Sequence, residues 1–79
     1  MKPAQVRMAR AALGWSLQEL ADRAGVHRNT VNNFERGHYG LSADNLEKVR
    51  RTLEAAGVDF IAENGGGPGV RLARPEGDA

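Results

Sequence analysis

The sequence contains no cysteine, few aromatic residues and no long hydrophobic run. Without cysteine, the 79-residue chain has no disulfide, no thiolate zinc site and no cysteine nucleophile. One Trp, one Tyr and two Phe are its only aromatic residues, so small aliphatic side chains must supply the core. No apolar run approaches the roughly 20 residues of a membrane helix, and the N-terminal segment lacks the apolar stretch of a signal peptide. We therefore expect one soluble, cytoplasmic domain that binds no membrane.

The net charge of +1 carries little information, but the charges are distributed unevenly along the chain. Residues 1–40 contain six basic and three acidic side chains (6 − 3 = +3), whereas residues 41–64 contain three basic and five acidic ones (3 − 5 = −2). A basic N-terminal half suits a polyanionic partner such as nucleic acid.

Apolar residues recur at helical spacing as far as residue 57, which predicts that this part is entirely helical. Ser16 and Ser42 are good N-caps, and Glu19 completes a capping box with Ser16. The helices are expected from about Pro3 to Leu13, from Ser16 to Gly25, from near His27 to Gly37, and from Ser42 to about Ala56. Their expected inner faces contain Val6, Ala9, Leu13, Leu17, Leu20, Ala21, Ala24, Val31, Phe34, Leu46, Val49 and Leu53.

The C-terminal segment has a different pattern. Residues 58–62 (VDFIA) and 70–73 (VRLA) alternate in polarity and include β-branched residues, and a glycine-rich stretch joins them. This pattern predicts a two-stranded β-hairpin. Because an isolated hairpin is marginally stable in water, it must either pack on the helices or pair with another chain. Both alternatives remain open at this point.

Residues 17–37 (LQELADRAGVHRNTVNNFERG) indicate the function, because they predict two short helices joined by a tight turn at Gly25. The outward face of the second of these helices is polar and free of carboxylates. Asparagine can bond adenine and arginine can bond guanine through two hydrogen bonds each. A solvated face usually mixes Glu and Lys, whereas Asn is a poor helix former, so the pattern favours DNA reading. The outward residues are Arg28, Asn29, Asn32, Asn33 and Arg36.

The stretch ARAALGWSLQELADRAGVHRNTVNNFERG resembles the lambda-repressor/Cro-like regulators, also called the XRE family. The resemblance covers about residues 5–57. It implies a mainly α, four-helix, lambda-repressor-like helix-turn-helix domain whose third helix lies in the major groove, usually as a two-fold dimer on a near-palindromic site. It also implies an ion pair between Arg10 and Glu35. The base-reading positions that it implies are His27, Arg28, Asn29, Asn32 and Asn33.

Three features depart from the family pattern. Leu17 stands where members commonly have a Gln that braces the third helix, and Gln18 follows it. His27 replaces the usual Ser or Thr, so a weaker cap is expected there. A hairpin replaces the fifth helix that many members have. We therefore divide the chain into a DNA-binding domain (1–57), a C-terminal β-hairpin that is a possible dimerisation element (58–73), and a flexible tail (74–79).

The remaining polar and apolar residues complete the predicted sites. Neither histidine has the neighbours of a metal ligand, and the glycine-rich loop lacks the lysine and following helix of a phosphate-binding loop. We expect no catalytic residue, no metal and no cofactor. The predicted DNA-backbone contacts are Arg10, Gln18, Arg36, His38 and Tyr39. The predicted dimerisation residues are Val58, Phe60, Ile61, Val70 and Leu72.

These observations predict a sequence-specific transcriptional regulator, a repressor or autoregulator that binds a near-palindromic operator as a homodimer. Its expected partners are double-stranded DNA and a second copy of the chain, with another protein as a further candidate. Two alternatives remain. The chain could be the DNA-binding antitoxin of a toxin-antitoxin pair, or a protein-interaction module that uses the same fold. No feature of the sequence suggests an enzyme.

Overall fold

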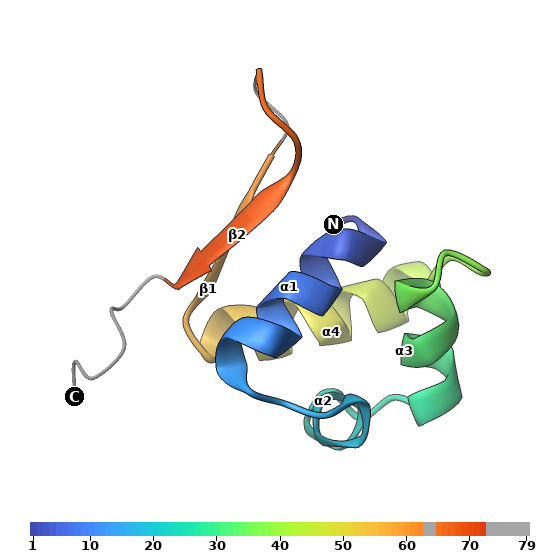
Figure 1. Cartoon of the computed structure of the whole chain (residues 1–79). Coiled ribbons are helices and arrows are strands. Elements are labelled where there is room, and N and C mark those ends of the chain that lie inside the picture. The colour runs from blue at the N-terminus through green and yellow to red at the C-terminus, as the bar shows by residue number, and fades with distance from the viewer. Residues whose placement is uncertain (63–64, 73–79) are drawn as a thin grey trace.

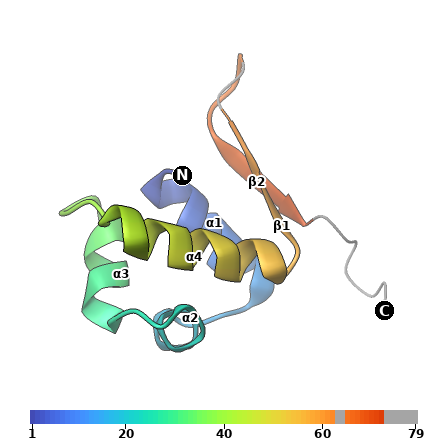
Figure 2. The same cartoon turned by 180° about the vertical axis from the view of Figure 1, so that it is seen from behind.

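The computed structural model describes residues 1–62 and 65–72, which form four helices followed by an antiparallel hairpin. In both views α1 and α4 lie at the centre, with α3 on one side and the hairpin on the other (Figures 1 and 2). The predicted mainly helical fold with a C-terminal hairpin is confirmed. The elements are α1 (Pro3–Leu13), α2 (Leu17–Ala24), α3 (Arg28–Glu35), α4 (Ala43–Ala55), β1 (Val58–Ile61) and β2 (Gly69–Leu72). The predicted strand residue Ala73 and the predicted tail lie outside the described residues.

The helix ends lie at the capping residues that the sequence predicts. The hydroxyl of Ser16 accepts the Glu19 amide N–H at 3.0 Å, and that of Ser42 accepts the Asn45 amide N–H at 3.1 Å. Gly25 ends α2 at φ 71°, a left-handed conformation that glycine adopts without steric penalty. Only half of the predicted capping box forms, because the Glu19 carboxylate accepts two N–H groups of Arg23 instead of the Ser16 amide. In the described part of the chain, no helix is both long and apolar enough to cross a bilayer.

The core gathers small aliphatic side chains from all four helices and from the first strand. Leu13 and Leu17 pack against the edge of the core instead of lying inside it. Leu46 is only partly buried, so the buried face of α4 contains fewer residues than the sequence predicts. Ala21, at 1% exposure, gives α2 and α3 room to approach each other. The buried apolar residues are Val6, Ala9, Leu20, Ala21, Ala24, Val31, Phe34, Val49, Leu53 and Val58.

The hairpin packs on the helices of its own chain. β1 and β2 pair antiparallel with Phe60 opposite Val70, and both side chains are partly buried against the core, as is Leu72. Val58 lies inside the core, at 2% exposure. The predicted dimerisation role therefore does not fit Val58, because no surface of this side chain is left for a partner. Ile61, at 39% exposure, remains accessible.

Gln5 fastens the hairpin to α1. Its side chain is buried, at 4% exposure, and its amide nitrogen donates to the backbone carbonyls of Ile61 at 3.1 Å and Gly69 at 3.0 Å. Its Oε1 accepts the Lys2 backbone N–H at 2.7 Å. A buried amide with all these partners stabilises one orientation of the hairpin, since each group left without a partner would cost free energy. Nothing in the sequence around Gln5 indicates this contact, because its partners lie 56 and 64 residues away.

We expect Gln5→Ala to destabilise the fold by about 1–3 kcal/mol, because two carbonyls and one amide lose their partner at a buried site. Urea denaturation measures the total effect, and hydrogen exchange should show faster exchange in β1 and β2 than in α3. Asp59→Asn is the matched control, since it weakens an exposed 3.5 Å contact with Arg71 on the outer face of the same hairpin and should change little. Equal effects of the two substitutions would contradict the role of Gln5.

Candidate nucleic-acid interface

Helix α3 presents a polar face to solvent and an apolar face to the core. Its inward residues Val31 and Phe34 are 1% and 7% exposed. These two contacts and the caps hold a helix that contains three weak helix formers. Of the predicted base-reading residues, His27, Arg28 and Asn29 are exposed, whereas Asn32 and Asn33 are half-buried. Arg36, the predicted backbone contact at the C-cap of α3, is exposed as well.

The outward side chains of α3 have no bonding partner within the described chain. Within residues 1–62 and 65–72, Arg28 and Arg36 are the only arginines whose side chains form no hydrogen bond or ion pair. Across the same residues, the side chains of Asn29, Asn32 and Asn33 form no hydrogen bond. The face therefore offers a set of unused donors and acceptors, which base edges and phosphates can satisfy.

Helix α1 holds the C-terminal end of α3 through two arginines. Arg10 donates through Nε and Nη2 to the two carboxylate oxygens of Glu35, each at 2.9 Å, and through Nη1 to the carbonyl of Trp15 at 3.0 Å. Glu35 is 3% exposed, and Arg10 supplies the opposite charge beside its buried carboxylate. Hydrogen bonding to the Glu35 carboxylate raises the pKa of Arg10 above its ordinary value. Arg10 therefore orients α3, and most of its bonding capacity is occupied within the chain.

Arg7 adds a second contact between α1 and α3, which the sequence does not indicate. Its guanidinium donates through Nη1 to the backbone carbonyl of Glu35, at the end of α3. A cation at this position also compensates the partial negative charge of a helix C-terminus, and the last turn of α3 has no basic residue of its own. Arg7 lies three residues before Arg10, and this spacing places both on one side of α1.

His27 caps α3 although it has no hydroxyl group. Its ring nitrogen Nδ1 accepts the Asn29 backbone N–H at 3.1 Å, which satisfies one of the free amides of the first turn. The sequence predicts a weaker cap at this position, and the structure shows that the imidazole ring forms the cap. The ring itself is exposed, so its second nitrogen can reach a ligand.

The other predicted backbone contacts lie on α2 and in the loop that follows α3. Gln18 is exposed, and its amide donates to Asp22 at 2.8 Å within α2. His38 and Tyr39 belong to the exposed loop after α3, and Tyr39 is 72% exposed. In the described residues no cluster of three His, Cys, Asp or Glu could hold a metal ion.

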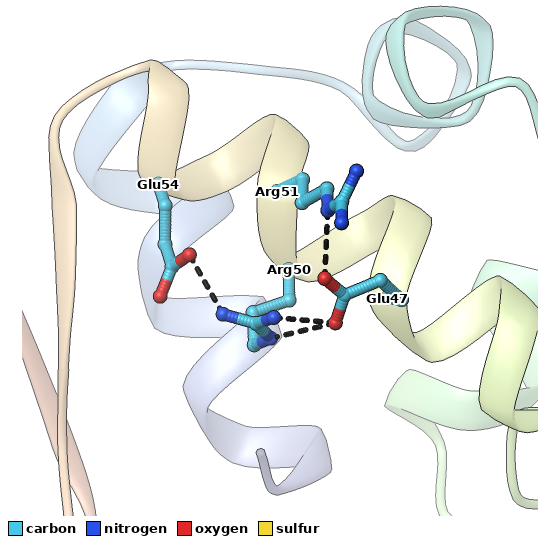
Figure 3. A network of polar contacts seen from close by, with 4 residues as sticks. All are labelled: Glu47, Arg50, Arg51 and Glu54. Atoms are coloured by element: carbon cyan, nitrogen blue, oxygen red, sulfur yellow. Dashed lines mark hydrogen bonds and ion pairs between the residues drawn. The ribbon is translucent and has the colours of Figure 1, made fainter.

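Helix α4 differs from α3, because its surface charges neutralise one another. Glu47 accepts hydrogen bonds from Arg50 and, at 2.7 Å, from Arg51, while Arg50 also donates to Glu54 at 2.8 Å (Figure 3). Lys48 and Asp44 pair at 3.3 Å one turn earlier. The unpaired positive charge therefore lies on α3 and not on α4.

This network makes a pH-dependent contribution to stability. Hydrogen bonds from Arg50 and then Arg51 lower the pKa of Glu47 below its ordinary value of 4.5. Because the folded-state pKa lies below the unfolded one, the contribution is complete above pH 4.5 and is lost as the pH falls through the folded-state pKa. We expect Glu47→Gln to lower the melting temperature slightly at pH 7, with the difference from the unmodified protein closing in acid. A difference that stays constant with pH would contradict this account.

Comparison with known proteins agrees with this geometry. The helix-turn-helix family pattern matches residues 6–58. A "Neisseria hypothetical transcription factor" from Neisseria meningitidis is 32% identical over 56 residues, which cover 71% of this chain and 53% of that protein. A "Competence pilus inhibition repressor" from Acinetobacter baylyi is 31% identical over 61 residues, which cover 75% of this chain and 56% of that protein.

A solved structure shares the fold as well. One chain of a SinR protein/SinI protein complex superposes with a TM-score of 0.64 at 34% identity, covering 68% of this chain and 53% of that chain. The present chain thus spans about half the length of these three proteins. The matched region contains most of α1 and all of α2 to α4, including the α2–turn–α3 unit described above. The chain belongs to the lambda-repressor/Cro-like (XRE) family of helix-turn-helix transcriptional regulators.

Proposed function

We propose that this protein is a sequence-specific DNA-binding regulator that inserts α3 into the major groove. One observation carries the proposal. In the described residues, the two arginines of the α3 face are the only ones without a partner, and the three asparagines beside them form no side-chain hydrogen bonds. Groups of this kind make bidentate contacts with guanine and adenine in the major groove.

The proposal divides the residues by what they contact. Base edges would be read from the outward face of α3, and the phosphate backbone would be bound from its rim, where contacts add affinity but no sequence information. The proposed base-reading residues are His27, Arg28, Asn29, Asn32 and Asn33, and the proposed backbone contacts are Gln18, Arg36, His38 and Tyr39. Arg10 is assigned mainly to the Glu35 pair.

We further propose a homodimer on a near-palindromic operator. A two-fold dimer would place its two α3 helices about one helical turn, ~34 Å, apart. The hairpin is the proposed contact, because a two-stranded sheet has edges that a second copy can cover. The residues proposed for this contact are Phe60, Ile61, Val70 and Leu72. Repression is the proposed outcome, and it is supported by the repressor named among the relatives.

A binding titration tests the proposal. Fluorescence anisotropy with DNA from the gene's own upstream region should show tight binding that weakens steeply with salt, since phosphate contacts release counterions. Footprinting should protect two half-sites, and analytical ultracentrifugation should show a dimer at the same concentrations. Equal affinity for the upstream region and for scrambled DNA would overturn sequence-specific recognition.

A protein partner is the second candidate, because the structural neighbour was solved in a complex with another protein. A toxin bound to this chain would make the protein an antitoxin. Co-expression with the neighbouring gene products followed by size-exclusion chromatography tests this candidate. A stoichiometric complex would support it, and separate elution would not.

A further inference from the structure

The ring of His27 is oriented by the cap that it forms. Nδ1 accepts the Asn29 backbone N–H at 3.1 Å, so this nitrogen uses its lone pair and has no proton. In a neutral imidazole the proton then lies on the other nitrogen, because the hydrogen bond made by one nitrogen selects the tautomer. The exposed edge of the ring is therefore an N–H donor at Nε2.

We infer that His27 contacts DNA only as a donor, through Nε2–H, and that its target is a hydrogen-bond acceptor. The inference rests on the proposed function and specifies the chemistry at one end of its reading face. Arg28, the next residue, is also a pure donor, whereas Asn29 has a donor and an acceptor. The N-terminal end of α3 thus selects acceptors, which are phosphate oxygens or the N7, O6 and O4 atoms of the major groove.

The two functions of His27 use different nitrogens, so substitutions can separate them. His27→Ser keeps an N-cap acceptor but removes the outer donor. His27→Ala removes both. A serine variant that is as stable as the unmodified protein but binds DNA less tightly would therefore isolate the contribution of Nε2–H.

The tautomer is measured first, on the full chain without DNA. A long-range ¹H–¹⁵N correlation spectrum of ¹⁵N-labelled protein, in mildly alkaline buffer where imidazole is neutral, distinguishes a protonated from an unprotonated ring nitrogen. The expected result is a protonated Nε2 and an unprotonated Nδ1 for His27. The inference makes no prediction about the tautomer of His38. A protonated Nδ1 would overturn the inference.

The contact is measured second, by titrating the operator with each variant. His27→Ser should bind roughly threefold to tenfold more weakly, the effect of one lost neutral hydrogen bond, with the salt dependence unchanged because a neutral ring releases no counterion. His27→Ala should bind at least as weakly and should also melt several degrees lower. Unchanged affinity of His27→Ser would overturn the contact.

The pattern of loss identifies the acceptor. If the acceptor lies on a base, His27→Ser should lose affinity only for DNA that contains one particular base pair. If the acceptor is a phosphate oxygen, His27→Ser should lose the same affinity on every sequence. If the unmodified protein fails to bind any DNA, the proposed function and the contact fail together. The tautomer result is independent of that outcome.

Discussion

Replacing Arg28 and Asn32 together by alanine should abolish specific operator binding and leave the fold intact. Each bidentate contact with a base contributes about 1–3 kcal/mol of discrimination, so losing two should cost roughly 2–6 kcal/mol. This corresponds to a weakening between about thirtyfold and more than ten-thousandfold. Stability should stay within about 0.5 kcal/mol of the unmodified protein, because neither side chain forms a hydrogen bond or ion pair with any residue that the structure describes.

Anisotropy titrations on operator and scrambled DNA measure this effect, with circular dichroism as the check on folding. Two single variants serve as controls. Arg36→Ala should weaken binding to both DNAs alike and reduce the salt slope by about 0.9, as expected for one lost phosphate contact. Arg51→Ala removes a cation that Glu47 already neutralises on α4 and should change neither affinity. Unfolding of the double variant would show that these side chains are misplaced.

Replacing Arg10 by methionine should have the largest effect on stability. The substitution leaves the Glu35 carboxylate, at 4% side-chain exposure, without the cation that pairs with it. Removing one partner of a buried pair typically costs 3–5 kcal/mol, and the 24% exposure of the Arg10 side chain places the expectation near 3 kcal/mol. For a chain of this size, that loss lowers the melting temperature by more than 10 °C. Differential scanning calorimetry measures it directly.

The double variant Arg10→Met/Glu35→Leu is the informative control for this experiment. It replaces both charges by apolar groups of similar size, so most of the stability should return, because no buried charge is left unpaired. If DNA affinity stays low in the refolded double variant, the pair orients α3 as well as stabilising it. Stability of Arg10→Met equal to that of the unmodified protein would show that the pair contributes nothing, or that Arg7 replaces it.

The helices and their ends could be predicted because their determinants are local. Ser16, Gly25 and Ser42 act within one turn of the residue that carries them, and the apolar spacing of each helix is read within a short window. The outward face of α3 follows from the same periodicity. The imidazole cap at His27 was not foreseen, since the usual N-cap acceptors are oxygen atoms.

Long-range contacts could not be derived in the same way. Gln5 bonds carbonyls 56 and 64 residues away, and nothing in a polar residue on a helix indicates which distant backbone it will meet. Arg7 likewise bonds a carbonyl 28 residues away. The packing of the hairpin on its own helices could not be predicted either, because the alternating pattern fits a hairpin paired with another chain equally well. In the structure Val58 is buried in the core of its own chain.

The unbonded face of α3 has a consequence for how such proteins diversify. This helix is held by Val31 and Phe34, by its caps and by the two arginines of α1. Within the described residues, its outward side chains form no hydrogen bond or ion pair. Substitutions on this face therefore cost little free energy of folding, so under the proposed function a lineage can acquire a new operator without first acquiring a compensating mutation in the core. The same separation makes the chain a suitable scaffold for libraries in which the outward positions are randomised and the α1–α3 contacts are kept.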